Sequence, residues 1–192
     1  AAAEPLAAAF YRLAFATAIL LLTALSGRWQ AVGRREFALS ALSGVCLAVH
    51  FGAWFFSLTM TSIASSTILV STHPFLVLLG AYLLWGETPR REAFAGLALA
   101  VLGTVLIGWG DFAAGQAAVF GDLLALLGAV AVAGYFLIGR TVRTHIGAIQ
   151  YSAIAYGSAA LVLLGGAIVA DSSLSGYPPS TWWALLGLAV FP

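Results

Sequence analysis

Seven apolar stretches, separated by short connectors, follow one another between Pro5 and Pro192. Hydrophobic residues make up 62% of the 192 residues and charged residues only 8%, whereas soluble domains are about one-quarter charged. A helix that crosses the hydrocarbon core of a bilayer needs about 20 mainly apolar residues. The pattern therefore predicts an all-α, polytopic integral membrane protein, with the lipid bilayer as its surroundings.

Six of the stretches are close to bilayer length and end at charged or turn-forming residues. Helices are therefore expected at residues 6–25, 37–58, 63–85, 93–109, 119–139 and 149–169. The seventh stretch begins at Trp182 and is about half as long as a membrane crossing. We expect from this pattern that the chain is truncated at both ends.

Arginines fall in alternate connectors. Seven of them belong to this set: Arg28, Arg34, Arg35, Arg90, Arg91, Arg140 and Arg143. The intervening connectors, at residues 60–62, 111–119 and 170–181, contain no lysine or arginine. By the positive-inside rule, the arginine-bearing side is cytoplasmic. Because the basic residues mark loops and form no patch, nucleic acid is excluded as a partner.

Arg12 is the exception, because it lies about five residues inside the first expected helix. A guanidinium there must find a carboxylate, carbonyl groups, water or a substrate, or reach toward the headgroups. A substrate contact and a purely structural role both remain open.

Two histidines lie on neighbouring helices, each about 17 Å by helical rise from the turn at residues 60–62 that joins them. Helix periodicity gives two faces: Cys46, His50, Trp54 and Ser57 on one, and Ser66, His73 and Val77 on the other. If these faces meet, they form a polar patch that could bind substrate or couple transport to protons, since histidine titrates near neutral pH. The alternative is two neutral histidines that bond to backbone or serine groups. Trp54 could likewise stack on a planar or cationic solute or pack against neighbouring helices.

Pro74 falls near the centre of the expected 63–85 helix. It has no N–H to donate to the carbonyl of Val70, so a kink with a free acceptor is expected. Transporters often use such carbonyls as ligands near the middle of the membrane, although many kinks are only architectural. Both interpretations remain open.

Small residues recur every four positions in two of the stretches, at Gly96, Ala100, Thr104 and Gly108 and at Gly121, Ala125, Ala129 and Ala133. Such ridges predict close helix–helix contacts. Asp122 is expected in the first turn of the 119–139 helix, where a carboxylate meets the positive end of the helix dipole.

The chain offers no sign of an enzyme: it has no nucleophile elbow, H-E-x-x-H motif, phosphate loop or paired intramembrane carboxylates. We expect no catalytic residues, no cofactor and no metal. Cys46 is the single cysteine, so an internal disulfide cannot form.

Three segments together resemble the EamA-like branch of the drug/metabolite transporter (DMT) superfamily. Residues 66–110, with a central Pro74, the run Leu84-Trp85-Gly86-Glu87, a charged loop and a glycine-bearing helix, are similar to the end of the family's first repeat. The run Gly121-Asp122-Leu123-Leu124-Ala125-Leu126, leading to Tyr135 and Arg140, resembles the opening of its second repeat. Pro5 with Arg12 resembles the start of its second helix.

This resemblance implies a ten-helix bundle of two inverted five-helix repeats with both termini cytoplasmic. Residues 1–110 would then hold most of the first repeat, helices two to five. Residues 119–192 would hold helices six and seven and part of helix eight.

The function that follows is a secondary transporter, expected to be an exporter, of small organic metabolites or drugs by alternating access across a bacterial inner membrane. Its expected substrate-binding residues are Arg12, His50, Trp54, His73 and Pro74. The rival interpretation is a non-transporting structural or regulatory subunit that assembles through the small-residue ridges. The oligomeric state is not predicted.

Overall fold

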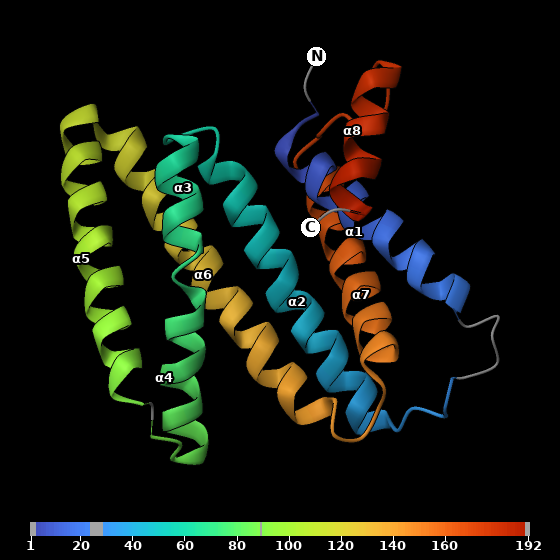
Figure 1. Ribbon diagram of the computed structural model, residues 1–192. Coiled ribbons are helices and arrows are strands. Elements are labelled where there is room, and N and C mark those ends of the chain that lie inside the picture. The colour runs from blue at the N-terminus through green and yellow to red at the C-terminus, as the bar shows by residue number, and fades with distance from the viewer. Residues whose placement is uncertain (1–2, 24–28, 89, 191–192) are drawn as a thin grey trace. The chain divides into compact units, whose positions relative to one another are not determined.

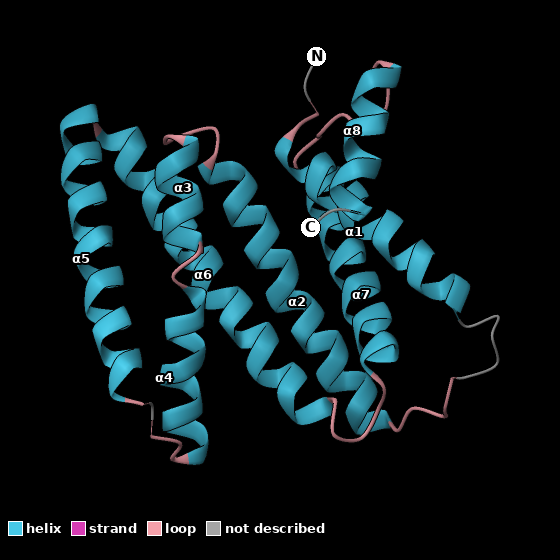
Figure 2. Ribbon diagram, in the orientation of Figure 1, coloured by secondary structure: helices cyan, strands magenta, loops and turns pink. Residues whose placement is uncertain are grey.

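The computed structural model describes residues 3–23, 29–88 and 90–190, without the side chains at 97, 104 and 107–114. Within these residues the elements are helices joined by loops and turns (Figures 1 and 2). The helices are α1 (Pro5–Leu22), α2 (Arg34–Ser57), α3 (Ile63–Val70), α4 (His73–Trp85), α5 (Arg91–Ala114), α6 (Gln116–Val142), α7 (Ala148–Val169) and α8 (Pro179–Val190). Five stretches are long and apolar enough to cross a membrane: α1, α2, α3 with α4, α6 and α7. The predicted all-α membrane fold is confirmed.

The positions of the helices agree with those expected from the sequence, but one expected connector is not found in the structure. The connector expected at residues 111–119 is wrong, because α5 continues to Ala114 and α6 begins at Gln116. Gly115 alone separates them, with a φ of 115°, a conformation that residues with a Cβ rarely adopt. A short polar run can remain helical when a single glycine makes the turn. Arg28 lies outside the described residues.

The structure divides into two compact units. Unit 1 is drawn from residues 1–48 and 138–192, and unit 2 from residues 49–137. Helices α2 and α6 contribute to both units. These boundaries differ from those of the two predicted repeats, which remain a prediction.

In unit 1, α1 packs against α7 and α8. The buried face of α7 is rich in alanine, including Ala155 and Ala159. Gly44 of α2 lies so close to this face that a Cβ added to it would be 2.4 Å from the carbonyl oxygen of Ala155. Small side chains on both helices therefore permit this close contact.

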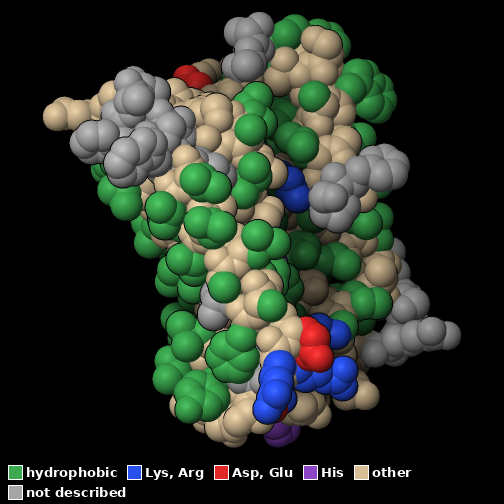
Figure 3. Space-filling view, turned by 60° about the vertical axis from the view of Figure 1, so that its left-hand side comes forward, with side chains coloured by type: hydrophobic (Ala, Val, Ile, Leu, Met, Phe, Trp, Pro, Cys, Tyr) green, Lys and Arg blue, Asp and Glu red, His purple; other side chains and the backbone are tan. Residues whose placement is uncertain are grey.

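Two hydrogen bonds in unit 1 each join a helix to a connector that was predicted to lie toward the same side of the membrane. Gln150, at the start of α7, donates its Nε2 to the carbonyl of Gln30, in an arginine-bearing connector, at 2.7 Å. At the other end, the Tyr11 hydroxyl donates to the carbonyl of Leu174 at 2.6 Å. On the face that Figure 3 draws, most of the Arg, Asp and Glu side chains lie near one end, and others lie farther along the face. Both contacts are consistent with the sides of the membrane that the alternating arginines predict.

Unit 2 is built around the first half of α6. Ala125 and Ala129 are fully buried and Ala133 nearly so, and Gly121 lies against the backbone of Thr61. Leu69 and Val70 of α3 pack with Ala125, and Trp54 and Leu126 lie on this core. The predicted ridge of small residues on α6 is thus confirmed. The ridge on α5 stays a prediction, because the side chains of Thr104 and Gly108 lie outside the description.

Candidate functional site

A helix break lies at the centre of the candidate site in unit 2. The span from Ile63 to Trp85 divides into α3 and α4 at Ser71 and Thr72, and Pro74 follows within the first turn of α4 (Figure 1). The amide of Thr72 bonds to the carbonyl of Leu69 at 3.2 Å, which tightens the chain before the proline. The kink predicted from Pro74 is confirmed.

The freed acceptor expected at this kink is occupied. His73 Nδ1 lies 3.1 Å from the carbonyl oxygen of Val70, the group to which an N–H at position 74 would have donated. A carbonyl can only accept, so Nδ1 carries the hydrogen in this contact. The expectation of a free acceptor is therefore wrong, because the neighbouring side chain replaces the missing backbone donor.

His73 also stacks on α6. Its ring lies parallel to that of Phe136, with ring centroids 5.6 Å apart and planes 13° from parallel. The helix break is thereby joined to α6 by this aromatic contact as well as by the packing of Leu69 and Val70 with Ala125.

His50 and Trp54 form a second aromatic group one helical turn apart on α2. Their rings are stacked, with centroids 6.0 Å apart and planes 19° from parallel. His50 Nδ1 donates to the carbonyl of Gly128 on α6 at 2.9 Å. A Cβ on Gly128 would lie 3.3 Å from the carbonyl oxygen of His50, so glycine permits the close approach of α2 and α6 here.

The two polar faces predicted on α2 and α3–α4 meet at their serines, where Ser57 and Ser66 share a hydrogen bond between hydroxyls. The histidines, in contrast, are held at different places on α6, at Gly128 and Phe136. Eight residues of helix separate these positions, a rise of about 12 Å. Each histidine thus has its own partner on α6, and each meets a backbone carbonyl.

Trp54 has an unusual polar atom. Within the described residues, its indole Nε1 is buried and has no hydrogen-bond partner. An unpaired buried donor costs about 1–3 kcal/mol. A hydrogen bond from this nitrogen to an acceptor on a bound molecule would therefore be favourable. The ring itself packs on the core of Leu69, Val70 and Ala125, so the packing role considered for Trp54 is present.

Arg12 belongs to unit 1. It is half-buried in α1, about 10 Å from the start of the helix, and its guanidinium interacts electrostatically with Tyr156 of α7. The other four predicted residues belong to unit 2. His73 and Pro74 lie at the break, whereas His50 and Trp54 lie on α2, where His50 bonds to α6.

Asp122 is a residue whose burial the sequence analysis missed. Because α6 begins at Gln116, Asp122 lies in the second turn, and its expected place in the first turn is wrong. It is only 6% exposed, and its Oδ1 accepts from the Thr61 hydroxyl at 2.9 Å. An acid inside an apolar run, directly after a glycine, was the available signal. Among the described residues, no three His, Cys, Asp or Glu side chains lie close enough together to hold a metal.

Comparison with known proteins adds a family and a fold. The family model of the EamA-like transporter family matches residues 1–109 and 119–192. A solved structure, titled "Crystal structure of protein", matches with a TM-score of 0.73 and 21% identity, over 99% of this chain and 67% of its own. At this identity the likeness shows a shared fold. Among curated proteins, no match was found.

Proposed function

The chain belongs to the EamA-like transporter family of the DMT superfamily, and from this premise we propose that it exports small organic metabolites or drugs by alternating access. Family membership and the membrane-spanning helices make it a multi-pass membrane transporter, with the bilayer and a small-molecule solute as its partners. The proposal adds the direction of transport, the class of cargo and a bacterial inner membrane as the location.

The observation that carries the proposal is the broken helix α3–α4 with aromatic and histidine side chains around it. Irregular backbone inside a membrane is tolerated where it is covered by protein or lines a cavity, and transporter sites commonly lie at such breaks. Here the break at Ser71 and Thr72 lies within a few residues of His73 and of the Val70 core. We propose that α3 and α4 move separately at this break during alternating access.

We assign solute contact to His50, Trp54, His73 and Pro74 in unit 2. Trp54 supplies a flat ring and a buried indole N–H, and the histidines supply imidazole rings, that of His73 directly after the break between α3 and α4. Arg12 is proposed as a contact for an anionic group of the solute, since a guanidinium remains charged at any physiological pH. The two repeats, residues 1–110 and 119–192, are proposed to rock against each other.

Proton coupling through His50 and His73 is part of the proposal. In each ring, Nδ1 donates to a carbonyl, and such a contact is retained whether the imidazole is neutral or charged. Protonation would therefore add charge inside the membrane without breaking these bonds, and that charge is costly enough to favour another conformation.

Solute flux in proteoliposomes tests the transport proposal. The protein is reconstituted and loaded with amino acids, nucleosides or cationic dyes, and flux is measured with and without a pH gradient. We expect a saturable flux of at least one class that the gradient accelerates, and a His50→Gln/His73→Gln double variant that loses the acceleration. A protein shown to be folded that moves none of these solutes would contradict the proposal. Flux with unchanged pH dependence in the double variant would contradict only the coupling.

The rival interpretation was a non-transporting subunit that assembles through small-residue ridges. The ridge on α6 does not support it. Ala125, Ala129 and Ala133 are already buried within unit 2, so they are not available to a partner protein. Membership of a transporter family also favours transport.

A further inference from the structure

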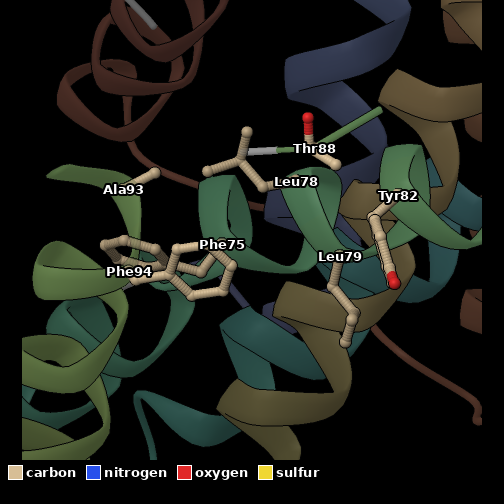
Figure 4. A pocket seen from close by; sticks show the side chains of 7 residues that line it. All are labelled: Phe75, Leu78, Leu79, Tyr82, Thr88, Ala93 and Phe94. Carbon is tan, nitrogen blue, oxygen red and sulfur yellow. The ribbon is translucent and has the colours of Figure 1, made fainter. Parts of the chain in front are cut away.

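An apolar groove separates α4 from α5 in unit 2 (Figure 4). Its volume is about 410 Å³, and its lining includes Phe75, Leu78, Leu79 and Tyr82 of α4 and Phe94 of α5. Phe75 reaches across to α5, where a Cβ on Gly96 would lie 3.2 Å from its ring. The lining of the groove is thus almost entirely apolar.

The helix faces around this groove are apolar and exposed. Leu83 of α4 is 70% exposed and Leu99 of α5 is 71% exposed. In a membrane protein, an exposed apolar face inside the bilayer is solvated by acyl chains, because lipid replaces water there. A hydrocarbon chain is therefore chemically suited to the groove and to the helix faces beside it.

One end of the groove reaches a charged connector. Thr88 lines the groove, and Arg90 and Arg91 follow it, both exposed. Glu87 precedes Thr88 and Glu92 lies in the first turn of α5, so the two arginines have a glutamate on either side of them in the sequence. Arginine binds phosphate oxygens through charge-assisted hydrogen bonds, and a carboxylate binds an ammonium group in the same way.

We propose that the α4–α5 groove is a binding site for a phospholipid with a zwitterionic, ammonium-bearing headgroup. One acyl chain lies along Phe75, Leu79 and Tyr82. The phosphate contacts Arg90 and Arg91, and the ammonium group contacts Glu92. A purely anionic headgroup would meet the glutamates unfavourably, whereas a headgroup with both charges matches the connector.

Photo-crosslinking of the protein in nanodiscs tests this site. The probe is a phosphatidylethanolamine that carries a diazirine on one acyl chain, and adducts are located by peptide mass spectrometry. We expect adducts on residues 75–94 to exceed those on the exposed outer face of α7, which samples bulk lipid. Equal labelling of both regions would overturn the proposal, as would absence of labelling in the groove, which is the result expected if another copy or another protein covers it.

A matched pair of variants separates the groove from the surrounding lipid. Ala93 also lines the groove, and Ala93→Trp should fill it and remove most of the groove adducts. Ala95 is exposed on the same helix, does not line the groove and lies on another face of α5, so Ala95→Trp should leave them unchanged. If Ala93→Trp does not fold, Ala93→Leu takes its place. Groove adducts that persist in the folded, filled variant would contradict binding in the groove.

Variants that remove charge from the connector test which lipid headgroup binds there. Arg90→Gln/Arg91→Gln should lower the groove adducts roughly three- to tenfold, the effect of losing charge-assisted bonds to a phosphate. Arg34→Gln/Arg35→Gln in unit 1, which removes the same charge elsewhere, should not lower them. A phosphatidylglycerol probe should give fewer adducts than phosphatidylethanolamine. If phosphatidylglycerol labels equally or better, the assignment of a zwitterionic headgroup is wrong. None of these results depends on the transported solute.

Discussion

His73 shows how one side chain completes a helix that a proline interrupts. Its Nδ1 donates to the carbonyl of Val70, the acceptor that Pro74 leaves without a backbone donor. His73→Phe keeps a ring to stack on Phe136 but removes the donor. We expect it to lower the free energy of unfolding in detergent by about 1 kcal/mol.

The same prediction has an internal control at Pro74. Pro74→Ala restores an N–H that can reach Val70, so His73→Phe should cost less in that background, with a coupling of about 0.5 kcal/mol or more. His73→Asn, whose amide nitrogen lies near the place of Nδ1, should keep most of the stability. Equal losses from His73→Phe in both backgrounds would show that the side chain does not replace the backbone donor.

At the scale of helices, glycine and alanine control how closely the spans approach. Gly44→Ala would place a Cβ 2.4 Å from the carbonyl oxygen of Ala155 and 2.7 Å from the Cβ of Ser158. Backbone cannot yield as a flexible side chain can, so α2 and α7 must separate. We expect a loss of about 1–3 kcal/mol in the free energy of unfolding.

Gly165→Ala on α7 is the matched control, because a Cβ there meets no atom within 4 Å. The same change of residue should be neutral, or stabilising by up to about 1 kcal/mol through helix propensity. Denaturation of both variants in one detergent gives the comparison. A Gly44→Ala protein as stable as Gly165→Ala would mean that the close contact of α2 with α7 is not formed in the membrane.

At the scale of the whole molecule, the placement of arginine predicts how the chain lies in the membrane. The turn after α6, with Arg140 and Arg143 nearby, is expected in the cytoplasm, and the loop between α7 and α8 on the opposite side. In a Cys46→Ser background, single cysteines are introduced as Thr144→Cys and Ser175→Cys, both at exposed positions. A membrane-impermeant maleimide added to intact cells should label only the Ser175→Cys protein, and permeabilisation should expose both. Labelling of Thr144→Cys in intact cells would reverse the orientation.

Much of the fold was predictable because its signals are local. A run of apolar residues must become a helix to cross lipid, whatever its neighbours are, since every backbone group needs a partner within the segment. Pro74 predicted the break, and the small residues of α6 predicted a buried ridge, because each effect acts within one helix. The prediction of a connector at 111–119 was wrong. A single glycine with a positive φ, Gly115, makes the turn there, and the residues on either side of it stay helical.

The candidate site was less predictable, because it depends on which helix faces meet. Side chains that face lipid are as apolar as side chains in the protein core, so hydropathy does not indicate which face of α2 turns toward α6. The sequence by itself determined the all-helical membrane fold, the positions of its spans and the family to which the chain is similar. Only the tertiary structure decided that His50 meets Gly128, that His73 meets Val70 and Phe136, and that Asp122 is buried beside Thr61. Those partners are set by small contacts between helices, whereas the spans are set by the composition of each helix alone.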